Sequence, residues 1–323
     1  MNPRTRILLT ALSAFVLLGG AVIFALVARD SGPPLSKGDS RGTPSLAAHD
    51  RLIFLSGRHL ASVPANATTG HAVVSDLQCV RVYAAAGTGA CMHQDDPWHY
   101  SLLTLDATLR QTSRHKIAGL PNRLRVSASG QMVSWTTFIG GESYNKGGFS
   151  TRTGILDLRT GTSVPNLETF AIHIAGHRSH AIDHNVWGVT FASDDNRFYA
   201  SLATGDDRYL VQGDLAARTL TTLESNVECP SLSPDGTRIA FKQAVDNDPR
   251  KGWRMSVLDL KTRTITHLAE TASVDDQAAW LDDSTVAYTL RAADGTPSIW
   301  SVPADGSGNP TLVRNNAESP AVI

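Results

Sequence analysis

The sequence predicts an all-β fold, a six-bladed β-propeller of four-stranded blades that is closed by the C-terminal strand. Two observations predict it. A hairpin pattern recurs along the chain with a spacing of about 45 residues, which is typical of propeller blades. The last residues match one arm of that hairpin, and the start of the repeat region matches the other arm. A separate apolar segment predicts one N-terminal transmembrane helix.

The clearest copy of the hairpin spans residues 227–242 and reads VECPSLSPDGTRIAFK. Its centre, the Ser-Pro-Asp-Gly of residues 233–236, is typical of a tight turn: proline presets φ, aspartate accepts local backbone hydrogen bonds and glycine tolerates positive φ. Apolar residues alternate on the arms, with Leu232 before the turn and Ile239 and Phe241 after it. We therefore expect a β-hairpin here.

The rest of each repeat unit follows from the same alignment. Further copies of the hairpin lie at residues 77–92, 121–136, 186–201 and 274–289. A third apolar strand follows each hairpin, at residues 102–106, 154–157, 209–214, 256–259 and 298–302. A short fourth strand, such as 219–223 or 264–268, completes the unit, and the interval between the copies at 121 and 186 is longer than the others. Four antiparallel strands in every unit predict the blades.

Ring closure is predicted from the two ends of the repeat region. Residues 316–322 (NAESPAV) align with residues 226–232 (NVECPSL), so the last segment supplies only an innermost strand. Its missing partner is residues 51–54 (RLIF), which match residues 238–241 (RIAF). One blade is therefore shared between the two segments, and pairing them would remove an exposed sheet edge.

The N-terminal region predicts membrane attachment. Residues 7–27 carry no charge and are long enough to cross a bilayer as a helix, although a cleaved signal peptide is the alternative. Arg4 and Arg6 precede this segment, so residues 1–6 are expected to be the cytoplasmic end. Residues 28–48 are rich in Pro, Gly and Ser and predict a flexible tether, and residues 49–323 predict an extracytoplasmic propeller on a single-pass protein of the cell membrane.

Composition excludes some classes of function. The net charge is −1, with 29 basic and 30 acidic residues, and no basic patch or motif points to nucleic acid. Residues 38–42 fit the G-x-S-x-G pattern of hydrolases, but they lie in the predicted tether and not at a strand-to-helix turn. We therefore expect no enzyme of that class and no cofactor.

The cysteines suggest one disulfide. Cys79 and Cys91 lie on the two arms of the hairpin at residues 77–92, where a cross-strand disulfide fits an exported protein. Two buried free thiols are the alternative. Cys229 has no evident partner and is expected to be a small buried residue.

Four histidines gather in the long interval, at positions 173, 177, 180 and 184. The surrounding pattern predicts a hairpin with a turn at residues 175–178, which would place His173 opposite His180. Two imidazoles could share a divalent ion, but no carboxylate or cysteine completes a ligand set with them. A solvated surface hairpin is therefore expected, and no metal site is predicted.

Acidic residues recur at the position that should line one mouth of the central channel. That position is occupied by Gln78, Asn122, Trp187, Glu228, Asp275 and Glu318, and Asp276 follows Asp275. Crowded carboxylates attract a cation or a basic peptide, so we expect a binding surface formed by the three acids of this position, Asp276 and Trp187. A hydrated channel wall without a ligand is the alternative. Glu228 and Asp275 could also lie at the separation that glycosidases use.

The repeat resembles that of a known family. The run LSPDGTRIAF at residues 232–241 and the run IWSVPADG at residues 299–306 look like the repeat of TolB-type six-bladed propellers, the WD-like repeats of bacterial envelope proteins. The resemblance covers about residues 49–323. The whole chain is most similar to the membrane-tethered TolB-like proteins of actinobacteria, since TolB itself has an α/β domain where this chain has an apolar segment and a tether.

The resemblance implies a function. It implies a non-catalytic, extracytoplasmic scaffold that binds an envelope protein or peptide, with the membrane contacted through the N-terminal helix. The alternative is a propeller enzyme or a carbohydrate- or ligand-binding sensor that uses the same acidic channel mouth.

Overall fold

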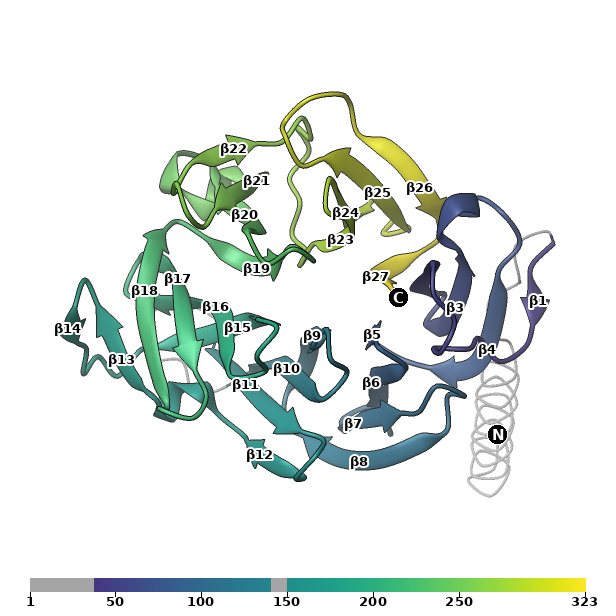
Figure 1. Ribbon diagram of the computed structural model, residues 1–323, viewed down its shortest axis with the longest axis horizontal. Helices are drawn as coiled ribbons and strands as arrows, with labels where there is room; N and C mark the ends of the chain where they lie inside the picture. The colour runs from purple at the N-terminus through teal and green to yellow at the C-terminus, as the bar shows by residue number, and fades with distance from the viewer. Residues whose placement is uncertain (1–37, 141–149) are drawn as a thin grey trace, which may run out of the picture. The chain divides into compact units, whose positions relative to one another are not determined.

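The computed structural model describes residues 38–140 and 150–323, which form six β-sheets arranged in a ring (Figure 1). The predicted transmembrane segment, residues 7–27, and the cytoplasmic end, residues 1–6, lie outside the described residues. Within the ranges that the structure does describe, no helix is both long enough and apolar enough to cross a bilayer.

Each sheet is one blade, and its strands are named from the channel outward. Blade 1 contains β27 (Glu318–Val322), β2 (Arg51–Ser56), β3 (His59–Pro64) and β4 (Val73–Gln78), with β1 (Ser40–Arg41) at its outer edge. Blade 2 contains β5 (Arg81–Ala85), β6 (Thr88–Gln94), β7 (Tyr100–Leu105) and β8 (Gln111–Ile117). Blade 3 contains β9 (Leu120–Val126), β10 (Met132–Ile139), β11 (Ser150–Asp157) and β12 (Thr162–Val164).

The second half of the ring follows the same order. Blade 4 contains β15 (Asn185–Phe191), β16 (Arg197–Thr204), β17 (Asp207–Asp214) and β18 (Thr219–Ser225), extended by β13 (Ala171–Ile174) and β14 (His177–Arg178). Blade 5 contains β19 (Glu228–Leu232), β20 (Arg238–Ala244), β21 (Trp253–Asp259) and β22 (Ile265–His267). Blade 6 contains β23 (Ala279–Asp282), β24 (Thr285–Arg291), β25 (Pro297–Pro303) and β26 (Thr311–Asn315). Short 3-10 helices are η1 (Ala65–Ala67), η2 (Leu167–Thr169), η3 (Val245–Asn247) and η4 (Pro249–Lys251).

The predicted closure of the ring is confirmed. Strand β27 pairs antiparallel with β2, with Leu52 opposite Val322 (Figure 1). The backbone N–H groups of Arg51 and Ile323 each donate to the carbonyl oxygen of the other, at 3.2 and 3.1 Å. Blade 1 therefore takes its inner strand from the last residues of the chain and its other strands from the first residues of the repeat region.

Part of the predicted flexible tether belongs to the ring. Ser40 and Arg41 of β1 pair in parallel with Val73 and Val74 of β4. Leu46 is 1% exposed and packs into an apolar cluster between blades 1 and 2. The compact unit therefore starts at Ser40, ahead of the predicted boundary at residue 49, because one leucine in a polar segment finds a buried site.

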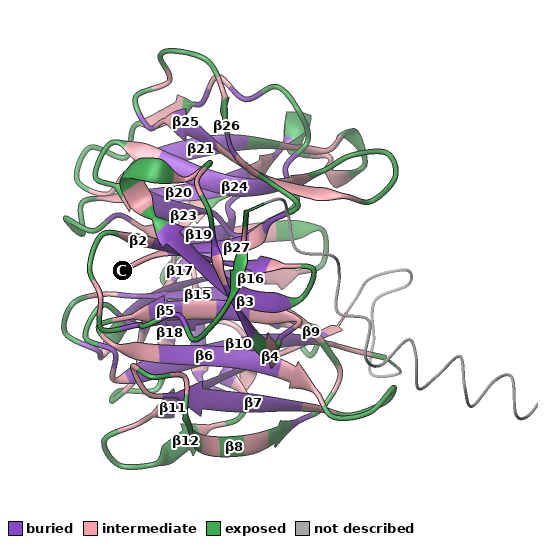
Figure 2. Ribbon diagram, turned by 90° about the vertical axis from the view of Figure 1, so that its right-hand side faces the viewer, coloured by how far each residue is buried: buried purple, intermediate pink, exposed green. Residues whose placement is uncertain are grey.

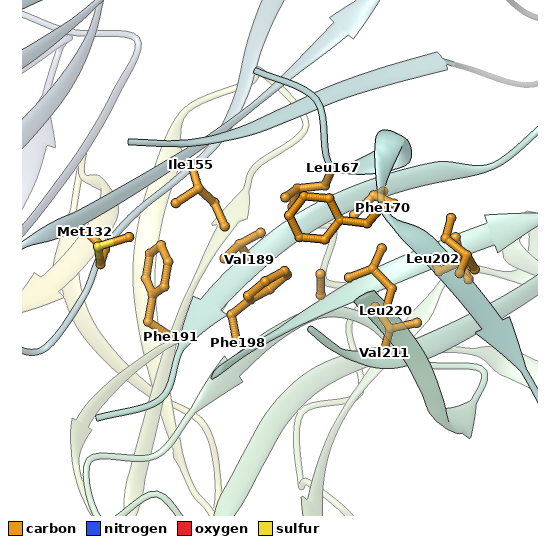
Figure 3. Packing of buried hydrophobic residues seen from close by; sticks show 13 residues of the cluster. Met132, Ile155, Leu167, Phe170, Val189, Phe191, Phe198, Leu202, Val211 and Leu220 are labelled. Carbon is orange, nitrogen blue, oxygen red and sulfur yellow. The ribbon is translucent and has the colours of Figure 1, made fainter. Parts of the chain in front are cut away.

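The blades are held together by apolar residues packed between neighbouring sheets. The strands are largely buried, whereas the loops that connect them are exposed (Figure 2). Between blades 3 and 4, Met132 and Ile155 face Phe191 and Phe198 (Figure 3). The ring centroids of Phe170 and Phe198 are 6.4 Å apart in an edge-to-face arrangement, which is favourable for aromatic pairs.

Two glycines make room for aromatic residues inside the blades. Gly154 lies opposite Trp135, and Gly213 lies opposite Phe198. A Cβ atom at Gly154 would come within 2.3 Å of the Trp135 ring, and one at Gly213 within 2.1 Å of the Phe198 ring. Each aromatic side chain therefore lies flat over the backbone of the adjacent strand.

The long interval between blades 3 and 4 extends the outer edge of blade 4. Strand β13 pairs in parallel with β18, and β14 pairs antiparallel with β13. Leu167 and Phe170, which precede β13, belong to the apolar cluster between the two blades. The additional residues thus cover a sheet edge and part of the core, in accordance with the way natural proteins protect edge strands.

Candidate functional site

The candidate site lies at the end of the channel where the inner strands begin, which we call the N-terminal mouth. Glu228 and Glu318 are the first residues of β19 and β27, and Asp275 and Asp276 precede β23. The predicted acids therefore do lie on the inner strands or directly before them. Each of them has a basic partner, which was not predicted.

Lys242 joins two of the predicted acids. Its Nζ lies 2.6 Å from Oδ1 of Asp275 and 3.3 Å from Oε2 of Glu228. Glu228 also contacts Nε of Arg208 at 3.2 Å and accepts a hydrogen bond from Nε1 of Trp253 at 3.2 Å. Nζ of Lys242 lies 4.0 Å from the centroid of the Trp253 ring. Glu228 is thus a buried carboxylate held by three donors.

The charges around Lys242 decide its protonation. Burial acts to lower the pKa of Lys242, but the interactions with Cys229 and with the carboxylates of Glu228 and Asp275 outweigh it, and the pKa is raised. Lys242 therefore stays positively charged although its side chain is only 5% exposed.

Arg123 reaches Asp275 from the other side of the channel. It lies on β9 of blade 3, and its Nη2 donates to Oδ1 of Asp275 of blade 6 at 3.3 Å. Its Nε donates to Sγ of Cys229 at 3.3 Å. Burial acts to raise the pKa of Asp275, but the charges of Lys242 and Arg123 lower it. Asp275 is therefore a carboxylate at neutral pH.

The remaining two acids have their own arginines. Nη1 of Arg81, on β5, lies 3.8 Å from Oδ1 of Asp276, and Arg291 forms an ion pair with Glu318. Burial lowers the pKa of Arg81, while the carboxylates of Asp276 and Glu318 act to raise it. The N-terminal mouth is thus a network of both signs of charge and not a patch of carboxylates alone.

Accessibility separates the predicted residues. The side chain of Asp275 is 60% exposed, whereas those of Glu228, Asp276 and Glu318 are 3%, 8% and 15% exposed. Trp187 lies on β15 and is 3% exposed. Asp275 is therefore the member of the predicted set that a binding partner can reach directly.

Two positions aligned with Glu228 do not have the expected role. Gln78 ends the outer strand β4 and contacts His59, since Nε2 of Gln78 and Nε2 of His59 are 3.4 Å apart. The inner strand of blade 2 begins only at Arg81, because its hairpin turns at Ala86 and Gly87, both with positive φ. Arg81 thus takes the place at the mouth that the alignment assigned to Gln78. Asn122 lies in a bulge of β9.

Some of the basic residues at the N-terminal mouth could have been predicted from a local sequence pattern. Arg123 and Arg125 alternate on an inner strand, so both should face the channel at the period of a β-strand. Lys242 lies opposite Glu228 in the predicted hairpin, where opposite charges commonly pair. Arg81 and Arg291 carry no such local signal.

The predicted disulfide between Cys79 and Cys91 is confirmed, with Cα atoms 5.5 Å apart. Cys79 does not lie on a hairpin arm, however. It lies in the short link between β4 and β5, and Val82 is the residue opposite Cys91. The disulfide therefore attaches the link between blades 1 and 2 covalently to β6.

Cys229 is buried as expected, at 1% exposure. Its φ is +52°, and the matching residues of two other inner strands are Gly188, with φ +67°, and Ser319, with φ +56°. Positive φ costs a non-glycine residue about 1 kcal/mol. All three residues lie in a β-bulge of an inner strand. The same bulge therefore recurs in three inner strands at the N-terminal mouth.

The predicted register of the histidine hairpin is wrong. His173 lies opposite Arg178, and His177 lies opposite Ile174, so His173 and His180 are not a cross-strand pair. The cause is a two-residue turn at Ala175 and Gly176, both with positive φ, in place of the predicted turn over residues 175–178. Among the described residues, no group of three or more His, Cys, Asp or Glu side chains is placed to hold a metal ion.

Comparisons with known proteins identify the fold. No family model and no curated protein matches the chain. The solved structure of TolB from Acinetobacter baumannii is similar with a TM-score of 0.62 and 15% identity, covering 84% of this chain and 66% of that one, slightly under two-thirds of its length. A putative TolB from Agrobacterium tumefaciens is similar with a TM-score of 0.53 and 11% identity, covering 82% of this chain and 88% of that one. The described residues have the six-bladed propeller fold of these TolB structures, as the sequence resemblance predicts.

Proposed function

We propose that the protein is a non-catalytic binding module that docks an envelope protein or peptide at the N-terminal mouth, outside the cytoplasm. The observation that carries the proposal is the accessibility of Asp275. Its side chain is 60% exposed, and its carboxylate is held in place by Lys242 and Arg123. A carboxylate that is held in place by buried cations loses little side-chain freedom when a partner binds. A partner that presents a cationic side chain or a cluster of N–H donors fits this position.

The arrangement of charges favours binding over hydrolysis. A glycosidase of the usual kind needs one carboxyl group that stays protonated near neutral pH, with a second carboxylate beside it. The pKa of Asp275 is lowered, and Glu228 is buried and held by Arg208, Lys242 and Trp253. Neither residue is therefore suited to act as the general acid, which supports a binding module over the glycosidase alternative.

The location in the cell envelope is also a proposal. It is supported by the similarity to TolB structures, because the TolB-type repeat that this sequence resembles is typical of bacterial envelope proteins. Residues 7–27 are proposed to anchor the chain in the cell membrane, with the propeller on the outer side. Protease added to intact cells is then expected to degrade the propeller. Full protection of the propeller in intact cells, together with digestion after lysis, would argue against this location.

Crosslinking in intact cells tests the proposed site. A photo-crosslinking amino acid near Asp275, for example at Ser273, is expected to capture one discrete protein. Asp275→Asn should reduce that capture by tenfold or more, since the substitution removes the accessible charge. Asp76→Asn is the matched control, because Asp76 has a side chain that is 96% exposed on the outer strand of blade 1.

The outcomes separate the two candidate functions. Capture that Asp275→Asn leaves unchanged removes the N-terminal mouth as the docking site. Cleavage of a glycan by the purified protein, lost in both Asp275→Asn and Glu228→Gln but kept in Asp76→Asn, would instead establish the enzyme alternative.

A further inference from the structure

The opposite end of the channel, where the inner strands end, contains a cavity of about 470 Å³. We call this end the C-terminal mouth. The cavity is lined by residues of inner strands, by the turns that follow them, and by Arg197 and Tyr199 of β16. Its aromatic side chains are Tyr83, Phe191, Tyr199 and Trp280. Its volume is within the range of small-molecule sites. None of the acids of the N-terminal mouth lines it.

Arg125 lines this cavity from β9 and is 4% exposed. Its Nη2 donates to the carbonyl oxygen of Ala278, on the opposite side of the channel, at 2.9 Å. Its guanidinium carbon lies 4.3 Å from the centroid of the Tyr83 ring. Its Nε has no hydrogen-bond partner among the described residues. One donor of this buried guanidinium therefore has no acceptor within the described part of the chain.

The charge of Arg125 is also unpaired within the described part of the chain. The other charged side chains of the lining have their own partners: Arg197 pairs with Asp194 at 3.2 Å, and Asp235 pairs with Arg238 at 3.5 Å. Asp235, which also lines the cavity, forms its ion pair with Arg238 and not with Arg125. Among the described residues, Arg125 is therefore the charged side chain of the lining that has no ion-pair partner.

A comparison with Arg123 shows that Arg125 lacks an anionic partner. The two arginines are two residues apart on β9, and both are less than 10% exposed. Arg123 has Asp275 and the Cys229 sulfur as partners, whereas Arg125 has, among the described residues, a carbonyl oxygen and an aromatic ring but no anion. Removing a cation from water is costly, and stacking on an aromatic ring offsets only part of that cost. An anion in the cavity would supply the rest.

We propose that the C-terminal mouth binds a small organic anion, a carboxylate on an apolar or aromatic body. The carboxylate accepts hydrogen bonds from the guanidinium of Arg125, and a charge-assisted bond of this kind is among the stronger ones in proteins. The body of the ligand packs against Trp280, Tyr199 and Phe191. This site is independent of the proposed docking of a protein at the N-terminal mouth.

Calorimetry on the full chain in lipid nanodiscs tests the proposal with three probes. 2-Naphthoate is expected to bind saturably and at least tenfold more tightly than 2-naphthamide, which has the same body without the charge. Equal affinities for the acid and the amide, or no saturable binding of the acid, would overturn the proposal. Tighter binding of 1-naphthyl phosphate than of 2-naphthoate would overturn the assignment of a carboxylate.

Variants locate the binding. Arg125→Met is expected to weaken 2-naphthoate binding at least tenfold, and Arg125→Lys less than Arg125→Met because the charge is kept. Arg218→Met is the matched control, since Arg218 also lies over an aromatic ring, that of Phe170, at 4.7 Å but outside the cavity. Ala128→Trp should also weaken binding, because Ala128 is an exposed residue of the lining and the larger side chain fills the cavity. Unchanged affinity in both Arg125→Met and Ala128→Trp would contradict the proposal, even if one of these proteins were less stable.

Discussion

Arg123 and Asp275 meet across the central channel, with Nη2 of the arginine 3.3 Å from Oδ1 of the aspartate. Arg123 belongs to blade 3 and Asp275 lies in the segment that leads into β23 of blade 6, so the contact joins opposite sides of the ring (Figure 1). Arg125 makes a second crossing of the same kind to Ala278. The channel is therefore bridged by side chains over part of its length.

Loss of the Lys242 charge should destabilise the fold. Lys242→Met leaves the buried carboxylate of Glu228 with one partner fewer, and removing one member of a buried ion pair costs about 3 kcal/mol. We expect a decrease of that order in the free energy of unfolding, measured by urea denaturation. Lys251→Met is the control: the Lys251–Asp246 pair is exposed, at 53% and 71%, and its loss should leave the free energy of unfolding nearly unchanged, because exposed ion pairs contribute little. Equal effects of the two substitutions would show that the network does not stabilise the fold.

Stability should depend on pH through Asp275. Its pKa is lowered in the folded protein, so its contribution is complete above the pKa of the unfolded chain, about 4, and is lost as the pH falls through the folded-state value. Wild type and Asp275→Asn should therefore differ in melting temperature at pH 6 and converge as the pH falls toward 2. A difference that stays constant over this range would contradict the lowered pKa.

The disulfide should be detectable by counting thiols. The chain has three cysteines, so unfolding without reductant should expose one reactive thiol, that of Cys229, and unfolding with reductant should expose three. Three reactive thiols without reductant would disprove the disulfide. Closing a loop with a sequence separation of 12 stabilises a fold by about 3 kcal/mol in the chain-entropy model, so the Cys79→Ser, Cys91→Ser double variant should lose up to that amount.

Gly213 should not tolerate a side chain. In Gly213→Ala the new Cβ would lie 2.1 Å from the Phe198 ring, so the ring or the strand must move. Overpacking of this kind costs about 1–3 kcal/mol. Gly140→Ala is the control, because a Cβ at Gly140 would meet no atom of the described residues within 4 Å. A melting temperature of Gly213→Ala equal to that of the control would show that the Phe198 ring can leave its place at no cost.

Much of the fold was predictable because its signals are local. The alternating arms around Pro234 and Asp235 predict the hairpin of blade 5, and the match of residues 316–322 to residues 226–232 predicts the closing strand. The errors come from two-residue turns. At Ala86–Gly87 and Ala175–Gly176 an alanine adopts positive φ. The alignment with the longer Ser-Pro-Asp-Gly turn therefore misplaced the register in blade 2, and the turn predicted over residues 175–178 misplaced it in the histidine hairpin.

The candidate site was predictable only in part. Glu228, Asp275 and Glu318 share one position of the repeat, so alignment of the sequence with itself finds them. Lys242 lies opposite Glu228 in the predicted hairpin, so this pairing has a local signal, but Arg123 reaches Asp275 from an opposite blade. Pairing across a channel depends on the closed ring, and no periodicity within one strand contains that information.

The shared blade has a consequence for biosynthesis. Strand β2 acquires its inner neighbour only from Glu318–Val322, which are synthesised after all the other strands of the ring, so a nascent chain cannot close the ring before these residues are made. Until then β2 presents an unsatisfied edge, which is a site for pairing with other chains. Pairing two segments that are so far apart in sequence is also slow, because the entropy of closing a long loop is lost before the strands make their contacts. Maturation of this protein should therefore be limited by a single late step, the insertion of β27.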